Sequence, residues 1–303
     1  MDLFVNGLAR GAIYALVALG YTMVYGILGM INFAHGDIFM IGMFAAVFAI
    51  GVLSTLWGPV LGVNLVIGAV LAILLAAAYG YANERIAYRR LRRAHILAPL
   101  TSAIGLSIVL QNFIWLSVSK DKIDFPRFDS GPLADTRIPL PLGAEASVSL
   151  LQAVILVSSL LLMGGLFLLI HRTRIGLAMR ATAQDQRMAA LVGVPVNKVI
   201  AFTFVLGSGL AAAAGVMVAM YQGVLRFDSG YSMGLKAFTA AILGGIGNIP
   251  GAVLGGFIIG MTEDLTSYRI GSDWKDGTTF LILMVVLILR PRGLLGERVA
   301  EKA

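Results

Sequence analysis

Residues 38–83 read "IFMIGMFAAVFAIGVLSTLWGPVLGVNLVIGAVLAILLAAAYGYAN", and this stretch contains no Asp, Glu, Lys, Arg or His. Four more stretches share this absence of charge, at 97–119, 146–170, 199–225 and 237–262. Each is longer than the roughly 20 apolar residues with which a helix crosses a bilayer. The sequence therefore predicts an all-α polytopic membrane protein.

The composition of the whole chain agrees with this prediction. Of the 303 residues, 58% are hydrophobic and 13% are charged, whereas ordinary soluble domains carry about 25% charged residues. The net charge of +7 does not indicate nucleic-acid binding, because the basic residues separate the apolar stretches rather than form one patch. The absence of cysteine excludes thiol catalysis, zinc-thiolate sites and disulfides.

The charged residues between the apolar stretches predict which loops lie on which side. Basic residues dominate 82–96, 171–198 and the C-terminal tail, and the positive-inside rule places these segments in the cytoplasm. Acidic residues outnumber basic ones in 120–145 and 263–276, which are predicted to be periplasmic loops. The chain is expected to form one transmembrane domain over its whole length, and the orientation of its N-terminus stays open.

The apolar stretch 237–262 is interrupted by "GGIGNIPG" at 244–251. Glycine and proline disfavour a continuous helix, and a single crossing here would place the basic tail outside. The segment is therefore predicted to enter the membrane, break and return. "ILGMINFAHG" at 27–36 aligns with "ILGGIGNIPG" at 242–251 with five identities in ten positions.

This alignment predicts an internal repeat with two interrupted or re-entrant helices, in a chain of about eight hydrophobic segments. Paired interruptions in two halves point to the central site of a transporter. The candidate translocation-path residues at the two breaks are Asn32, His35, Gly36, Asp37, Gly247, Asn248 and Pro250. For the polar residues of the first break three roles stay open, namely a helix cap, a lining of the path and a proton relay.

Residues 174–195, in the second predicted cytoplasmic segment, form an amphipathic pattern. Leu177, Met188 and Leu191 fall on one face at helical spacing. Asp185 is expected to cap a second short helix that Gly193 ends. Such a unit suits docking into a groove of another protein, or contact with anionic lipid, and the spacing favours neither.

Glycines and two isolated cations accompany the apolar segments near both ends of the chain. Glycine allows helices to approach closely, and the glycines expected to do so are Gly7, Gly11, Gly20, Gly255, Gly256 and Gly260. Arg10 and Lys236 are expected to extend toward the membrane interface.

No motif in the chain indicates catalysis. The phosphate-binding pattern G-x-x-x-x-G-K-[ST] is absent, as are H-E-x-x-H and G-x-S-x-G. No carboxylate pair stands at a position that the sequence identifies as intramembrane. The chain is therefore not expected to be an enzyme, to hydrolyse ATP itself or to need a metal or cofactor.

Three long blocks carry a resemblance to a known family. They are "GAIYALVALGYTMVYGILGMINFAHGDIFMIG" (11–42), "RIGLAMRATAQDQRMAALVGV" (174–194) and "FTAAILGGIGNIPGAVLGGFIIG" (238–260). In this order they resemble the permease subunits of bacterial branched-chain amino acid ABC importers of the LivH type. The likeness extends over nearly the full length of the chain.

The resemblance implies a set of partners and a location. Such permeases work in the bacterial inner membrane beside a second, related permease chain, with two cytoplasmic ATPase subunits and a periplasmic amino acid-binding protein. It also implies that 174–195 contacts the ATPases during alternating access. The residues assigned to this coupling are Arg180, Gln184, Asp185, Arg187, Ala189, Ala190 and Gly193. The usual signature has a glutamate before its two alanines, where this chain has Met188, so the register of the contact stays open.

Another class of transporter is the alternative. A proton- or ion-coupled secondary transporter of a small polar solute would use His35 and Asp37 as a titrating pair. Neither reading identifies the solute, and the sequence does not decide whether the partner permease is identical or different.

Overall fold

The computed structural model describes residues 2–58, 61–92, 94–95, 97–118, 121–125, 136–139 and 147–296. The first half of the chain contains the helices α1 (Asp2–Leu28), α2 (His35–Trp57), α3 (Leu61–Asn83), the π-helix η1 (Glu84–Tyr88), α4 (Arg89–Leu91) and α5 (Leu97–Ser117). The second half contains α7 (Leu150–Arg172), α8 (Arg174–Gln184), α9 (Gln186–Leu191), α10 (Val196–Gln222), α11 (Ser229–Gly244), α12 (Ile249–Arg269), the 3₁₀ helix η2 (Ser272–Trp274) and α13 (Lys275–Leu289).

Four very short strands complete the described structure. β1 (Ile123–Asp124) pairs antiparallel with β4 (Val224–Leu225), and β2 (Arg137–Pro139) pairs antiparallel with β3 (Ser147–Ser149). The first pair ties the segment after α5 to the end of α10. Most of the predicted periplasmic loop 120–145 lies outside the described residues.

Six of the described helices are long and apolar enough to cross a membrane, namely α1, α2, α3 with its continuation through α4, α5, α7 and α10. The prediction of a polytopic all-α membrane protein is confirmed at this level. α11 and α13 have 16 and 15 residues, fewer than the roughly 20 that a full crossing needs. The eight segments, the re-entrant course and the internal repeat stay predictions.

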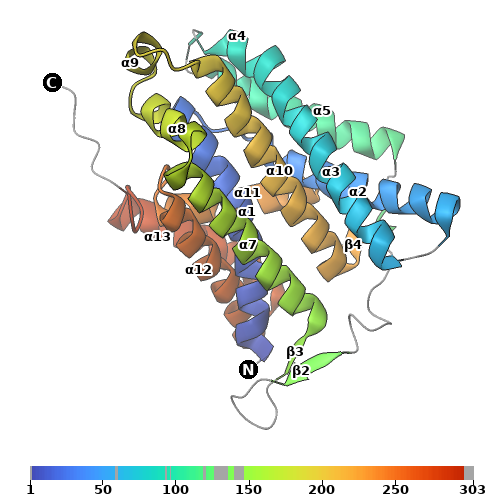
Figure 1. Cartoon of the computed structure of the whole chain (residues 1–303). Coiled ribbons are helices and arrows are strands. Elements are labelled where there is room, and N and C mark those ends of the chain that lie inside the picture. The colour runs from blue at the N-terminus through green and yellow to red at the C-terminus, as the bar shows by residue number, and fades with distance from the viewer. Residues whose placement is uncertain are drawn as a thin grey trace.

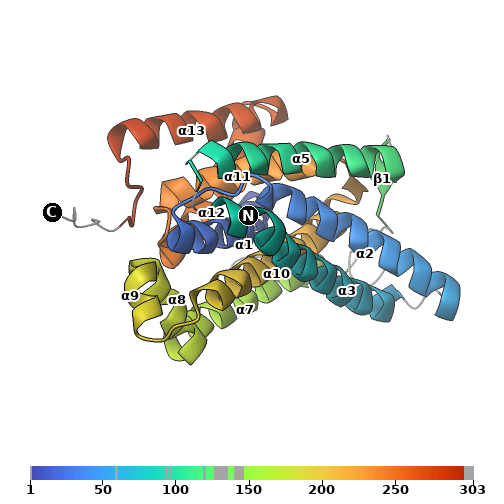
Figure 2. The ribbon, with the colours of Figure 1, turned by 90° about the horizontal axis from the view of Figure 1, so that it is seen from above.

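α1 lies in the middle of the bundle, with α7, α10, α11 and α12 packed around it (Figures 1 and 2). Four fully buried alanines, at 9, 12, 15 and 18, alternate with larger apolar residues on its surface and allow several helices to approach it at once. α4, α8 and α9 lie at one end of the molecule in Figure 1, and β2 and β3 lie at the other. Two of the three segments predicted to be cytoplasmic, 82–96 and 171–198, therefore share one end.

Glycines bring α1 and α12 into close antiparallel contact, as their positions in the sequence predicted. A methyl group added to Gly256 would lie 2.5 Å from the backbone nitrogen of Ala15, and one added to Gly11 would lie 2.7 Å from Cα of Phe257. Gly260 faces the backbone of Gly11 even more closely. No side chain other than hydrogen fits between the two backbones there.

Both predicted helix interruptions are present. α1 ends before Gly29, whose φ is +67°, and α2 begins at His35. α11 and α12 form an antiparallel hairpin whose turn contains Gly245 and Gly247, with φ of +105° and +95°. Glycine suits these turns because other residues rarely adopt positive φ.

The boundaries of the predicted loops change in two places. Helix continues from α3 through η1 and α4 to Leu91, inside the predicted loop 82–96. α12 continues to Arg269, so the predicted loop 263–276 is shorter than the sequence indicated. Two of the four acidic residues that suggested this loop, Glu263 and Asp264, are buried in α12 beside cations, which offset part of the cost of burying them.

Candidate functional site

The polar residues of the first interruption are buried at the start of α2. Asn32, His35 and Asp37 are at most 2% exposed. The Tyr88 hydroxyl donates to Oδ1 of Asn32 at 2.8 Å, and Nε2 of Gln111 donates to Oδ1 of Asp37 at 3.0 Å. Two other helices, η1 and α5, therefore hold this break in place.

The possible role of Asp37 as a helix cap is not what the structure shows. α2 begins two residues earlier, at His35, and its N-cap residue Ala34 makes no side-chain cap. Asp37 lies inside the first turn and contacts Gln111. Of the three roles considered for Asp37, lining of the translocation path and proton transfer therefore stay open.

Glycines allow the first turn of α2 to lie against α1 and α11. A side chain on Gly20 would collide with the ring of His35, which also meets Tyr21 edge-on with a centroid distance of 4.7 Å. A methyl group on Gly36 would collide with the backbone of Gly230. The polar residues of the break are thus placed at the crossing of three helices.

Many polar atoms of this region have no hydrogen-bond partner within the chain. They include Thr22 Oγ1 on α1 and Asn32 Nδ2, His35 Nε2 and Asp37 Oδ2 around the start of α2. Tyr79 OH and both side-chain polar atoms of Asn83, in the last turns of α3, are unpartnered as well. Buried polar groups normally find partners, and unpartnered groups call for an explanation such as a water or a ligand. The gathering of unpartnered polar atoms in this region suits a translocation path for a polar solute.

Sequence reasoning missed several residues of this region. Ser107, Gln111 and Tyr88 hold the break, and Thr22 and Tyr79 carry unpartnered hydroxyls. Tyr88 stands in a charged segment of the chain, and the others lie on largely apolar helices. Their partners lie on other helices, so no spacing along the chain could have singled them out.

The second interruption lies in a more exposed setting. Oδ1 of Asn248 accepts from the Gly251 N–H at 2.8 Å and caps α12, and its Nδ2 donates to the Leu295 carbonyl at 2.9 Å. Gly247 and Pro250 are exposed in the same turn. Gly26 of α1 lies beside Gly247. The two breaks are therefore neighbours at one end of α1, but only the first is buried.

The α8–α9 unit has the form that its sequence predicted. Asp185 accepts from the N–H groups of Arg187 and Met188, at 2.8 and 3.1 Å, and caps α9. Gly193, with φ of +86°, ends it. Gln186 donates to the carbonyl of Ile27 at 2.8 Å, which joins the unit to the end of α1.

The predicted apolar face of this unit is uncovered. Leu177, Met188 and Leu191 are all more than half exposed, and Leu191 reaches 81%. Of the assigned coupling residues, Ala189 is buried, Asp185 is intermediate and the others are exposed, namely Arg180, Gln184, Arg187, Ala190 and Gly193. The unit thus offers both charged and apolar groups at one end of the molecule.

A hollow of about 1120 Å³ lies between this unit, the end of α1 and the segment around α4. Its walls include Arg89, Arg92 and Arg187. Glu84 is fully buried behind it and pairs with both Arg89 and Arg92. The sequence predicted a basic loop over 82–96, and the structure anchors part of this segment by a buried carboxylate.

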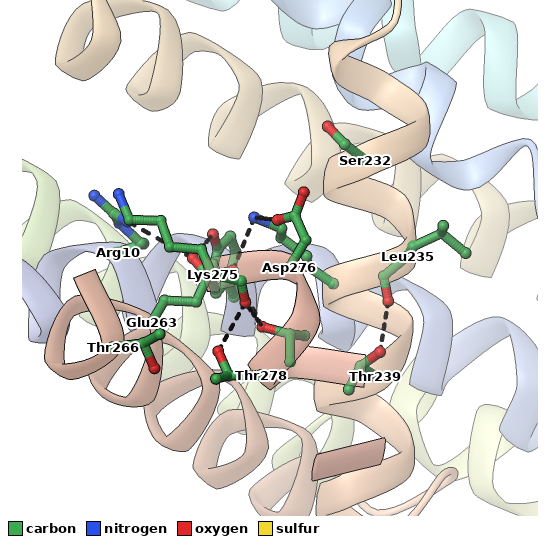
Figure 3. A network of polar contacts seen from close by, with 12 residues as sticks. Arg10, Ser232, Leu235, Thr239, Glu263, Thr266, Lys275, Asp276 and Thr278 are labelled. Carbon is green, nitrogen blue, oxygen red and sulfur yellow. Dashed lines mark hydrogen bonds and ion pairs between the residues drawn. The ribbon is translucent and has the colours of Figure 1, made fainter. Parts of the chain in front are cut away.

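A second buried cluster corrects two sequence expectations (Figure 3). The side chains of Arg10 and Lys236 are mostly buried and form ion pairs with acids of α12 and α13, where single cations reaching toward the interface were expected. Lys236 pairs with Glu263 at 2.8 Å and with Asp276 at 2.7 Å, and Arg10 pairs with Asp264 at 3.2 Å. Glu263 and Asp264 form a buried carboxylate pair that the sequence did not predict. The cations that stabilise this pair come from other helices, α1 and α11.

Comparison with known proteins gives the family. The model of the family described as "Branched-chain amino acid transport system / permease component" matches residues 3–288. The chain belongs to this family. This match confirms the resemblance to branched-chain amino acid permeases that the sequence indicated.

Individual relatives match over almost their whole length. The permease protein LivH of the high-affinity branched-chain amino acid transport system is 42% identical in Salmonella typhimurium LT2 and 43% identical in Escherichia coli K12. The corresponding protein BraD of Pseudomonas aeruginosa is 44% identical. Each alignment covers 98% of this chain and 96% of the relative.

Proposed function

We propose that this chain is the permease subunit of an ATP-driven importer of branched-chain amino acids in a bacterial inner membrane. The full-length identity of 42–44% to permeases named for high-affinity branched-chain amino acid transport carries the proposal. The buried polar residues of the first break support it, because an amino acid needs polar partners for its charged end only. The remainder of such a substrate is apolar.

The partners follow from the same proposal. A second permease chain completes the path, a periplasmic protein delivers the amino acid, and two cytoplasmic ATPases supply the energy. The exposed apolar face around Leu177, Met188 and Leu191 favours docking of the α8–α9 unit on an ATPase. The hydrogen bond between Gln186 and the Ile27 carbonyl then links movement of the ATPase to the break after α1. Around this break the permease pair opens the path to one side of the membrane and then to the other.

The test is transport by the purified complex in liposomes. Uptake of labelled leucine is expected to need ATP and the binding protein, to stop with vanadate and to persist with a proton uncoupler at constant ATP. Recovery of this chain alone, active in liposomes without ATP and inhibited by the uncoupler, would instead establish the proton-coupled alternative.

The substitution Leu191→Asp tests the docking face. Because Leu191 is exposed, its stability effect is expected within about 0.5 kcal/mol. A charge in the centre of an apolar interface costs at least ~1.4 kcal/mol, so leucine uptake is expected to fall about tenfold or more. Ile270→Asp is the matched control, since Ile270 is also exposed but lies after α12. Equal uptake by both variants would argue against this docking face.

Asn248→Ala is expected to lower uptake without preventing assembly. The variant loses an N-cap worth about 1 kcal/mol, together with the bond to Leu295. Looser closure of the α11–α12 turn is expected to reduce uptake by about fivefold or less. Asn248→Asp keeps the capping oxygen and is the comparison. Unchanged uptake of the alanine variant at equal chain level would show that the turn does not contribute to transport.

A further inference from the structure

Asp37 is a buried carboxylate without a cation. It is 1% exposed, and none of the ion pairs within the described part of the chain includes it. Oδ1 accepts from Gln111, and Oδ2 has no partner. Burying a carboxylate is costly unless a cation or several donors compensate for the lost water. This residue therefore has an unused capacity to bind a positive group.

Four partly buried cations of the described helices are already paired with other acids. Arg10 and Lys236 bind Glu263, Asp264 and Asp276 on α12 and α13. Arg89 and Arg92 bind Glu84. These pairings leave Asp37 for a cation that comes from outside the chain.

On the basis of the proposed function, we propose that Asp37 binds the α-ammonium group of the transported amino acid. An ammonium group has three N–H donors and needs several acceptors. Oδ2 of Asp37 is one. The Ser107 hydroxyl oxygen accepts from the same Gln111 amide as Oδ1 of Asp37 and supplies a second beside the carboxylate. The unpartnered Tyr79 hydroxyl, on α3 packed against α2, is a further acceptor.

The helix starts around Asp37 explain how its charge is held while the site is empty. Asp37 lies in the first turn of α2, and a methyl group on Gly230 of α11 would lie 3.0 Å from its Oδ1. Helix N-termini carry partial positive charge, which stabilises a nearby carboxylate. Two such ends partly compensate Asp37, and a bound ammonium group completes the compensation.

α5 closes the site and offers a way into it. Its contact with Asp37 is made by Ser107 and Gln111, on the narrow buried face of the helix. Its outer face, with Ile108 and Phe113, is more than half exposed. A small displacement of α5 would therefore uncover the carboxylate without disturbing the centre of the bundle.

The experiment measures ligand-induced thermal stabilisation of the purified importer in lipid nanodiscs without the binding protein. Leucine and leucinamide, which keep the ammonium group, are expected to raise the melting temperature, whereas 4-methylpentanoate, which lacks it, is not. Asp37→Asn keeps an oxygen that accepts from Gln111 and is expected to remove both shifts. Asp273→Asn, at an exposed acid of η2, is the control and is expected to keep them.

Three results would overturn the inference. They are shifts that persist in Asp37→Asn, an equal shift with 4-methylpentanoate, and the absence of any shift in the wild-type importer. A shift produced by sodium in place of choline, present in wild type and lost in Asp37→Asn, would assign Asp37 to a free cation instead. The proposed function is judged separately, since it fails only when the wild-type importer with ATP and the binding protein moves no leucine.

Discussion

Glu263→Leu is expected to lower the stability of the folded chain by about 3–5 kcal/mol, because the change leaves cations buried without their carboxylate. Glu263 is fully buried and accepts from the Tyr14 hydroxyl at 2.5 Å and the Thr279 hydroxyl at 3.2 Å. It also pairs with Lys236. One side chain thus joins α1, α11, α12 and α13, and its loss acts on four helices at once.

Thermal unfolding in detergent, followed by the fraction of chain that stays monodisperse, measures this effect. Glu263→Gln keeps a hydrogen-bonding group of the same shape and is expected to lose less than the leucine variant. Asp273→Asn, at an acid on the exposed η2 segment, is the control and is expected to change little. A leucine variant as stable as wild type would mean that the cluster does not hold these helices together.

Gly260→Leu is expected to have an effect of similar size through packing. The added side chain would enter the backbone of Gly11 on α1, where no flexible side chain can move aside. Overpacking costs about 1–3 kcal/mol and more where backbone must shift. The contact extends along α1 through Gly256 and Ala15, so separation at one turn opens its neighbours.

Chain accumulation in the membrane and thermal unfolding check this expectation. Gly164→Leu is the matched control, because Gly164 lies within α7 and a methyl group there would meet nothing within 4 Å. We expect the control to accumulate normally and Gly260→Leu to be nearly absent. Equal accumulation of the two variants would contradict the close contact of α1 and α12.

The buried acids behind these effects were hidden from sequence reasoning. Glu263 and Asp264 stand beside an apolar stretch, so charge counting assigned them to a loop. Their cations, Arg10 and Lys236, lie far away along the chain, and only the packing of α1, α11 and α12 brings them together. Asp37 is a similar case, because its partner Gln111 belongs to a separate helix.

The sequence by itself determined the features that depend on local chemistry. Charge-free stretches require helices in a membrane, and Asp185 caps α9 whatever surrounds it. Glycine ends helices at 29 and 245, and Pro250 lies in the first turn of α12. Only the tertiary structure decided which buried carboxylates are paired with a cation and which one is not. Pairing is a property of distance in space, and here Lys236 reaches Glu263 while Asp37 is left with no cation of the described chain.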